Sequence, residues 1–303
     1  MTREFQGYNT SSAANRHTRD RKCQGIPTSE LNRKGPDIGL ITVFPPEEDA
    51  FFAISAFKPH PLHPFVDLLG RRFLVGKING KKIIYVRCGI GMVNAAAATQ
   101  QMLDFFDITG IVHFGIAGNV NNSMSIGDVT IPKQFAHTGI WDWLNPNAKL
   151  NANNNIGQLD IESYNVPKGH GSNLLGHIVY NSEPFFSETG EPNSAQPLLW
   201  APISEHWLKL AANLEDLSLE QSVNSTLFLE RKPKLVVGLK GSTANIFVDN
   251  AAYRDFLFQA FKVSSVDMES SAVVMLGQNG IDIFGSLAAT NAAKAVITFL
   301  QHL

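Results

Sequence analysis

Residues 111–132 read IVHFGIAGNVNNSMSIGDVTIP, and the rest of the chain is organised around them. A short apolar run breaks into Gly115-Ile116-Ala117-Gly118, and a second apolar run follows after a polar turn. Small residues at the end of a buried strand let the backbone approach a ligand closely. Ligands sit at the carboxyl ends of strands in open α/β sheets, so we expect Gly115, Ala117 and Gly118 to line a binding site. A tight turn between two core strands fits the same residues.

A second stretch, far downstream, carries a related pattern. Residues 266–272 read VDMESSA, in which an apolar run ends in a carboxylate at the mouth of a small-residue helix. Together and in this order, the two stretches resemble the nucleoside phosphorylase and nucleosidase superfamily, which includes purine and uridine phosphorylases and methylthioadenosine nucleosidases. The resemblance runs from about residue 33 to the end and is strongest to the plant branch of bark and vegetative storage proteins. It implies a three-layer α/β/α domain with a mixed central sheet.

The composition is that of a globular chain. Of its 303 residues, 44% are hydrophobic and 17% are charged, which permits a sizeable core in one large domain or two small ones. The net charge is −2 and no basic block occurs, so we expect neither nucleic acid nor a membrane surface as a partner. No apolar run reaches membrane-spanning length. Cys23 and Cys88 provide neither a disulfide framework nor metal-ligand spacing, so no metal is expected.

The chain divides into regions of different composition. Residues 1–34 are polar and basic without an apolar segment, so we expect a disordered arm, or a transit segment, rather than a secretory signal. A cytoplasmic location is then the default, although storage-type relatives are often secretory or vacuolar. We expect residues 35–303 to form the phosphorylase-like domain, with a loop-rich insertion at residues 141–231 over the ligand edge of the sheet. All four tryptophans lie in this insertion and could either stack on a flat base or anchor the insertion.

Short-range patterns predict the order of elements along the domain. The apolar run 38–44 is typical of a strand buried on both faces, and the acidic residues after it suit a helix start. The runs 73–78 and 81–86 flank Asn79-Gly80, the strongest short-range hairpin signal. The alternation of strands and helices favours an α/β fold. Further strands are predicted at 129–131, 234–238 and 263–268, and helices at 93–106, 204–214, 251–261, 270–276 and 284–303.

The second strand of the hairpin runs into Gly89-Ile90-Gly91 before the predicted helix 93–106. A strand, a Gly-x-Gly turn and a helix together place backbone N–H groups where an anion can bind. We therefore take Cys88 and Gly89 as candidate ligand contacts, although a Gly-x-Gly turn alone is a weak signal.

Cleavage of an N-glycosidic bond passes through an oxocarbenium-like ribosyl centre and makes three demands. The ribose must be held through its hydroxyl groups, a nucleophile must lie beneath the anomeric carbon, and an acid must protonate the departing base.

The resemblance implies residues for the first two demands. Glu269 accepts hydrogen bonds from the 2′ and 3′ hydroxyls, and Met268 lies against the sugar; a helix-terminal carboxylate is the plainer interpretation of Glu269. Phe247 and Val248 bracket the base, which favours a purine. Glu47 orients an attacking water in nucleosidase relatives, with Glu48 as the alternative here because Pro45-Pro46 departs from the family pattern.

Phosphate is a candidate co-substrate, and no other cofactor is expected. Relatives that are true phosphorylases hold it with arginines, whereas here His113 stands at the arginine position of the central strand and Ile116 where a hydroxyl residue is usual. Without arginines, phosphate would depend on backbone N–H groups. Arg87 is the nearest candidate cation, and classical phosphorolysis is disfavoured.

The general acid is the missing part. Relatives place an aspartate in an Arg-x-x-Ser-Asp motif after the helix equivalent to 270–276, and this chain has no such motif. We expect no strand between that helix and the final one, which would leave a gap in the sheet, and Asp282 is not an equivalent by motif. An absent acid removes about 10²–10⁴-fold in rate.

Three functions therefore stay open. The first is a pentosyltransferase or nucleosidase acting on purine-type ribosides. The second is a non-catalytic storage protein, and the third is a nucleoside-binding module. Because relatives assemble as dimers, trimers or hexamers, we expect a homo-oligomer.

Overall fold

The computed structural model describes residues 31–32, 35–145, 147–149, 156–164, 173–186, 194–222, 226, 228–276, 280–285 and 289–303. The expected disordered arm at residues 1–34 lies outside the described residues, except for Leu31 and Asn32. Parts of the insertion expected at residues 141–231 lie outside them as well. No helix in the described part of the chain is long and apolar enough to cross a bilayer.

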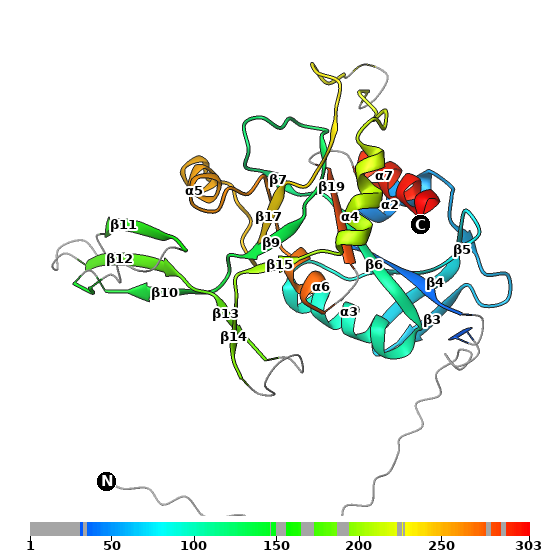
Figure 1. Cartoon of the computed structure of the whole chain (residues 1–303), viewed down its shortest axis with the longest axis horizontal. Helices are drawn as coiled ribbons and strands as arrows, with labels where there is room; N and C mark the ends of the chain where they lie inside the picture. The colour runs from blue at the N-terminus through cyan, green and yellow to red at the C-terminus, as the bar shows by residue number, and fades with distance from the viewer. Residues whose placement is uncertain are drawn as a thin grey trace, which may run out of the picture.

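A mixed sheet of nine described strands forms the centre of the molecule (Figure 1). Apolar runs that alternate with glycine-containing turns account for these strands, and β1 is buried along nearly its whole length, as its continuous apolar sequence predicts. From edge to edge the strands are β16 (Leu235–Val237), β8 (Val129–Ile131), β19 (Gly280–Gly285), β6 (Ile108–Gly115), β1 (Asp37–Thr42), β5 (Lys81–Arg87), β4 (Arg71–Ile78) and β2 (Lys58–Pro59), and β3 (Phe65–Leu68) also pairs with β4.

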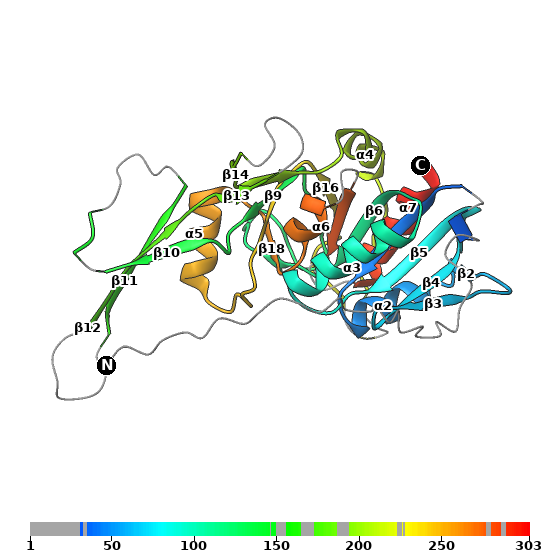
Figure 2. The same cartoon turned by 90° about the horizontal axis from the view of Figure 1, so that it is seen from below.

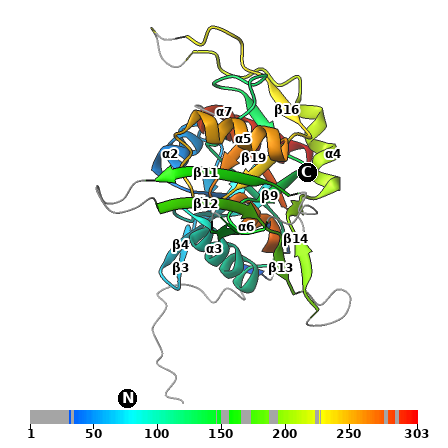
Figure 3. The ribbon, with the colours of Figure 1, turned by 90° about the vertical axis from the view of Figure 1, so that its left-hand side faces the viewer.

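Helices cover both faces of this sheet, so the predicted three-layer α/β/α architecture is confirmed (Figures 1 and 3). Helices α2 (Pro45–Ala53) and α7 (Ala289–His302) pack on one face, where Phe51 and Phe299 join the buried cluster that contains Leu40 of β1. Helices α3 (Met92–Phe105) and α6 (Ser270–Leu276) pack on the other, where Met102 and Val273 are buried.

The predicted hairpin is also confirmed. Strands β4 and β5 pair antiparallel with Ile78 opposite Lys81, and Asn79 and Gly80 turn the chain with φ angles of 49° and 84°. Both values lie in the left-handed region that asparagine and glycine adopt most readily.

A second, five-stranded sheet was not predicted. Its described strands are β15 (Trp200–Pro202), β9 (Gln134–His137), β17 (Lys240–Thr243), β18 (Ser265–Asp267) and β7 (Gly118–Asn119), in that order. The chain leaves the central sheet at Gly115, the end of β6, and enters the second sheet at Gly118, the start of β7. The Gly-Ile-Ala-Gly stretch is therefore the crossing between two sheets.

The insertion is more regular than its loop-like composition suggested. Strands β10 (Trp141–Leu144), β12 (Asn173–Tyr180) and β11 (Gln158–Tyr164) form a sheet that projects beside α5 (Ala251–Phe261) (Figure 2). A hairpin of β13 (Glu183–Phe185) and β14 (Gln196–Leu198) follows, and then come α4 (Glu205–Ala211) and the 3₁₀ turn η1 (Ala212–Leu214). Trp207 is buried against Phe299 of α7, with ring centroids 5.7 Å apart, so this tryptophan anchors the insertion to the main core.

The prediction of a gap in the central sheet is wrong. Strand β19 lies between β6, with which it pairs in parallel, and β8, with which it pairs antiparallel, and α7 begins only at Ala289. The sequence predicts a helix from residue 284 and no strand before it, whereas the structure has a strand at Gly280–Gly285. Strands β6 and β8 have backbone N–H and C=O groups that require partners, and a six-residue segment with two isoleucines supplies them. In this register Asp282 of β19 is paired with His113 of β6.

Candidate functional site

A cavity of about 380 Å³ lies at the carboxyl ends of β1 and β6, between the two sheets. Segments that are distant in the sequence contribute to its wall, because parallel strands end at one edge of a sheet. The wall includes most of the residues singled out from the sequence. The lining residues are Val43, Phe44, Glu47, Ile90, Ile116, Ala117, Gly118, Ile246, Phe247, Val248, Val266, Asp267, Met268 and Glu269.

Glu47 is held by backbone N–H groups from two strand ends. Its Oε2 accepts hydrogen bonds from the amides of Val43 at 2.7 Å and Phe44 at 3.3 Å, and its Oε1 accepts one from Ile116 at 2.7 Å. The side chain is 2% exposed, and this burial raises the pKa of its carboxyl, while the three N–H groups oppose the rise. The alternative, Glu48, pairs with Arg87 and does not line this cavity.

Gly115 makes room for Glu47 rather than for a ligand. A Cβ atom at this position would lie 2.7 Å from Cδ of Glu47, closer than real Cβ contacts allow. The small residue predicted to admit a ligand therefore admits a carboxylate of the same chain. Ala117 and Gly118 do line the cavity, as predicted.

Glu269 also lines the cavity and is 6% exposed. Its Oε1 accepts a hydrogen bond from the amide of Gly91 at 2.6 Å, and its Oε2 accepts one from Met268 at 3.1 Å. Burial raises its pKa to about 7, the Asp267 carboxylate adds to the rise, and the Gly91 amide opposes it. Gly91 is the N-cap of α3, so the anion site predicted from the Gly-x-Gly turn is occupied by the carboxylate of Glu269.

A buried network beneath Glu269 was missed by sequence reasoning. Asp267 accepts hydrogen bonds from Thr243 Oγ1 at 2.6 Å, from the backbone amides of Glu269 and Ser270 at 3.2 Å each, and from the Ser270 hydroxyl. Ser270 Oγ also lies 3.3 Å from Nδ1 of the fully buried His113. An aspartate that bonds the amides two and three residues ahead is a turn and capping pattern, which could have been recognised in VDMES. The network fixes the turn that aims Glu269 at the cavity.

Phe247 and Val248 form an apolar rim. They lie in the loop between β17 and α5, and Phe247 is 85% exposed at the mouth of the cavity. Among the described residues of the insertion, none lines the cavity, so its tryptophans provide no stacking surface there. The planar faces available to a base belong to Phe247 and Phe44.

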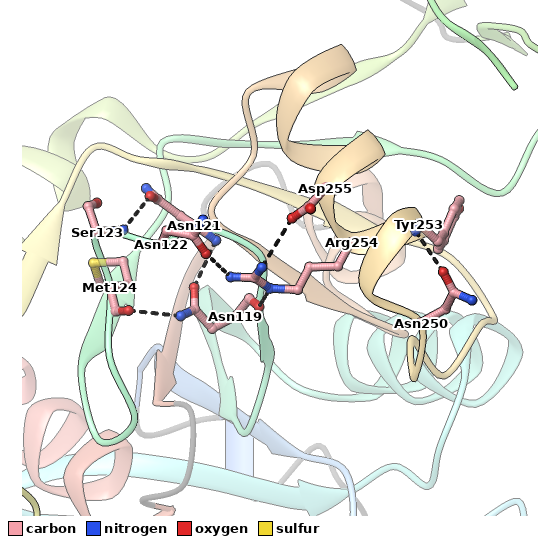
Figure 4. Close-up of polar contacts among 9 residues, drawn as sticks. All are labelled: Asn119, Asn121, Asn122, Ser123, Met124, Asn250, Tyr253, Arg254 and Asp255. Atoms are coloured by element: carbon pink, nitrogen blue, oxygen red, sulfur yellow. Dashed lines mark hydrogen bonds and ion pairs between the residues drawn. The ribbon is translucent and has the colours of Figure 1, made fainter.

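A cluster of polar contacts links α5 to the segment that follows Gly118 (Figure 4). Arg254 of α5 donates from Nε to the backbone oxygen of Asn119 at 3.0 Å and from its guanidinium group to the side chain of Asn122. Asn250 caps α5 by accepting a hydrogen bond from the Tyr253 amide at 2.8 Å. The segment after Gly118 and the helix after the rim loop are thereby held together.

Cys88 and Gly89 line a separate cavity of about 520 Å³ next to the first. Burial raises the pKa of the Cys88 thiol to about 12, so this group is a neutral thiol. Arg87 also borders this second cavity, where it pairs with Glu48. Cys88 and Gly89 thus line the second cavity, but Cys88 lies close enough to Glu269 and Glu47 for both carboxylates to raise the pKa of its thiol further.

The first cavity has no arginine or lysine in the lining that the described residues provide. Its charged groups in the described lining are the carboxylates of Glu47, Asp267 and Glu269. Within the described part of the chain, no cluster of three or more histidine, cysteine, aspartate or glutamate side chains could hold a metal ion.

Comparison with known proteins agrees with this architecture. The family model described as "Phosphorylase superfamily" matches residues 37–302. Bark storage protein A of Populus deltoides is similar to this chain, with 32% identity over 265 residues that cover 85% of this chain and 81% of that protein. A 5′-methylthioadenosine/S-adenosylhomocysteine nucleosidase of Shewanella denitrificans is 33% identical over 100 residues, which cover 33% of this chain and 41% of that protein.

Solved structures share the fold. The native futalosine hydrolase of Helicobacter pylori superimposes with a TM-score of 0.59 at 17% identity, covering 89% of this chain and 100% of that chain. The 5′-methylthioadenosine/S-adenosylhomocysteine nucleosidase of Helicobacter pylori, in complex with a substituted pyrrolidin-3-ol, gives a TM-score of 0.58 at 18% identity, covering 88% of this chain and 99% of that chain. At these identities the likeness concerns the fold alone.

Proposed function

Because this chain belongs to the phosphorylase superfamily, we propose that its cavity binds a purine-type riboside and that Glu47 directs water at the N-glycosidic bond. The observation that carries the proposal is the convergence of two buried carboxylates, Glu47 and Glu269, on one cavity with an aromatic rim. Neither carboxylate has a lysine or arginine partner in the described lining, which supports a role toward a ligand.

Glu269 is the proposed ribose-binding group. Each of its oxygens accepts one backbone N–H and keeps a further lone pair, so acceptor capacity remains for two hydroxyl groups. Met268 lies beside it in the cavity wall and supplies an apolar surface for the sugar. Phe247 and Val248 bracket the base from the rim.

Water is the proposed nucleophile. A phosphate dianion requires cationic or multiple N–H donors, and the described lining contains no lysine or arginine. The water oxygen bonds to the anomeric carbon, the carbon–nitrogen bond breaks with its electron pair going to the base, and Glu47 takes the water proton. Burial makes Glu47 more basic than an exposed glutamate and suits it to this role.

The base must also take up a proton as it leaves. Asp267, the remaining carboxylate of the described lining, is surrounded by four hydrogen-bond donors and acts as an acceptor. We therefore propose that solvent donates this proton to the base. Cleavage should then be slower by about 10²–10⁴-fold than with a positioned acid.

The test is release of free base from adenosine and inosine, with and without inorganic phosphate. We expect slow, phosphate-independent release that is lost in Glu47→Gln and retained in Glu230→Gln, an exposed control. Release only in the presence of phosphate would overturn the choice of water.

A second candidate is a storage protein without catalysis. The 32% identity to bark storage protein A and the absence of an Arg-x-x-Ser-Asp motif favour it. Saturable nucleoside binding with no base release would support this candidate, and the absence of both binding and release would reject the riboside site.

A further inference from the structure

A third cavity, of about 420 Å³, lies at the opposite edge of the central sheet from the proposed riboside site. Asp37, the first residue of β1, lines it, whereas the riboside site lies beyond the last residue of the same strand. Six residues of extended strand separate the two edges by about 20 Å. This cavity is therefore independent of the proposed function.

Two lysines stand side by side at its rim. Strand β2 pairs antiparallel with β4, and Lys58 is directly opposite Lys77. Residues in this relation project from the same face of a sheet, and like charges so placed repel each other. Both side chains are exposed, and neither has an ion-pair partner in the described part of the chain. The Lys58 ammonium donates a hydrogen bond to the backbone oxygen of Ser55, at 3.0 Å.

The close approach of these strands depends on a glycine. Gly76 is paired with Pro59, and a Cβ atom at Gly76 would lie 2.5 Å from the backbone oxygen of Lys58. A larger residue would push β2 away from β4 and separate the two lysines. The juxtaposition of like charges is thus a consequence of tight backbone packing.

A third lysine lies deeper in the same cavity. Lys82 donates to the backbone oxygen of Gly35 at 2.6 Å, and its ammonium is 4.0 Å from Oδ1 of Asp37. Burial raises the pKa of Asp37 to about 6, and Lys82 opposes this rise. Among the described lining residues, one carboxylate therefore stands against three ammonium groups.

Two histidines and an apolar wall complete the cavity. The rings of His60 and His63 stack with centroids 5.4 Å apart and an interplanar angle of 14°. Val75 and Ile83 belong to the apolar part of the lining and are buried.

We propose that this cavity binds a small organic anion, with a phosphate or carboxylate head group between Lys58 and Lys77 and an apolar body against Val75 and Ile83. The anion supplies the counter-charge that the described residues lack, and ammonium groups bind such oxyanions through charge-assisted hydrogen bonds. Because the cavity also has an apolar wall, we expect it to prefer an organic anion to a free inorganic ion.

Ligand-observed NMR titrations of the full-length protein with phenyl phosphate, benzoate and benzyl alcohol test the proposal. We expect saturable binding of at least one anion, no comparable binding of benzyl alcohol, and weaker affinity at higher salt. Comparison of the two anions identifies the preferred head group.

The decisive variant is K58Q/K77Q, which removes both charges at exposed positions. We expect it to weaken anion binding by at least about tenfold, as loss of charge-assisted hydrogen bonds predicts. The matched control K133Q/K232Q removes two exposed lysines elsewhere and should leave binding unchanged.

Three results would overturn the proposal. They are the absence of saturable binding of both anions to wild type, equal weakening in the two double variants, and benzyl alcohol binding as tightly as the anions. Unfolding temperatures of both variants, expected to stay close to wild type, exclude loss of folding as the cause.

Discussion

Replacing Glu269 by glutamine should stabilise the protein progressively, relative to wild type, as the pH rises from about 4.5 to about 7. Burial raises the pKa of this carboxyl from 4.5 to about 7 in the folded protein. A group with a higher pKa in the folded than in the unfolded state costs stability as it ionises, so the wild type loses free energy of unfolding across this interval. This pKa shift corresponds to a loss of about 3 kcal/mol in the free energy of unfolding. The glutamine variant does not lose this amount, because its side chain does not ionise.

The magnitude rests on the local geometry. Glu269 is 6% exposed, so solvent screens its charge little. Glutamine can accept from either Gly91 or Met268 but presents an amide NH₂ to the other, which adds a pH-independent loss of about 1–3 kcal/mol. The dependence of the difference on pH, rather than its absolute value, is therefore the signature of burial.

Urea unfolding of wild type and E269Q at several pH values between about 4.5 and 8 measures this difference. Asp37 and Glu47 also have raised pKa values, but they titrate in both proteins and largely cancel. The exposed control E230Q should show no comparable trend. A difference between wild type and E269Q that stays constant over the range would refute the reasoning.

The remaining predictions concern the walls of the cavity. Gly115→Ala brings a methyl group against the Glu47 carboxylate, so urea unfolding should show about 1–3 kcal/mol of destabilisation, and unchanged stability would contradict the packing. Arg254→Ala removes the contacts to Asn119 and the following loop, so amide hydrogen exchange should accelerate at residues 119–124 while β1 keeps its protection. Phe247→Ala should change stability by less than about 0.5 kcal/mol because the ring is 85% exposed. It should weaken purine riboside binding about 2–10-fold in calorimetry, and unaltered affinity would exclude the ring from base contact.

Much of the fold was accessible from short-range patterns. The boundaries predicted for α5, α6 and β8 coincide with the observed ones, because a capping asparagine, small residues and a terminal proline lie next to them in the sequence. The hairpin at Asn79-Gly80 could be predicted from its own turn residues alone. Two sequence motifs and a family resemblance predict the candidate site, because they assign Glu47 and Glu269 to the same site.

Other features escaped prediction because they depend on neighbours far along the chain. Residues 280–285 form a strand because β6 and β8 both have backbone groups to pair with it, whereas the sequence predicts no strand before a final helix that starts at residue 284. The sheet in the insertion brings together segments that asparagine-rich and proline-rich stretches separate. Propensity was a weak guide in both places, since tertiary hydrogen bonding outweighed it.

The sequence by itself determined the turns, the apolar runs and the identity of the two carboxylates. Only the tertiary structure decided what these carboxylates meet: Glu269 takes its N–H from Gly91, 178 residues away, and Glu47 takes one from Ile116, 69 residues away. The glycines at 91 and 115 admit carboxylates of this chain to positions that the sequence pattern had assigned to a ligand. The physical reason is that burial of a charge must be matched by donors close in space, and local sequence does not specify which donors those are.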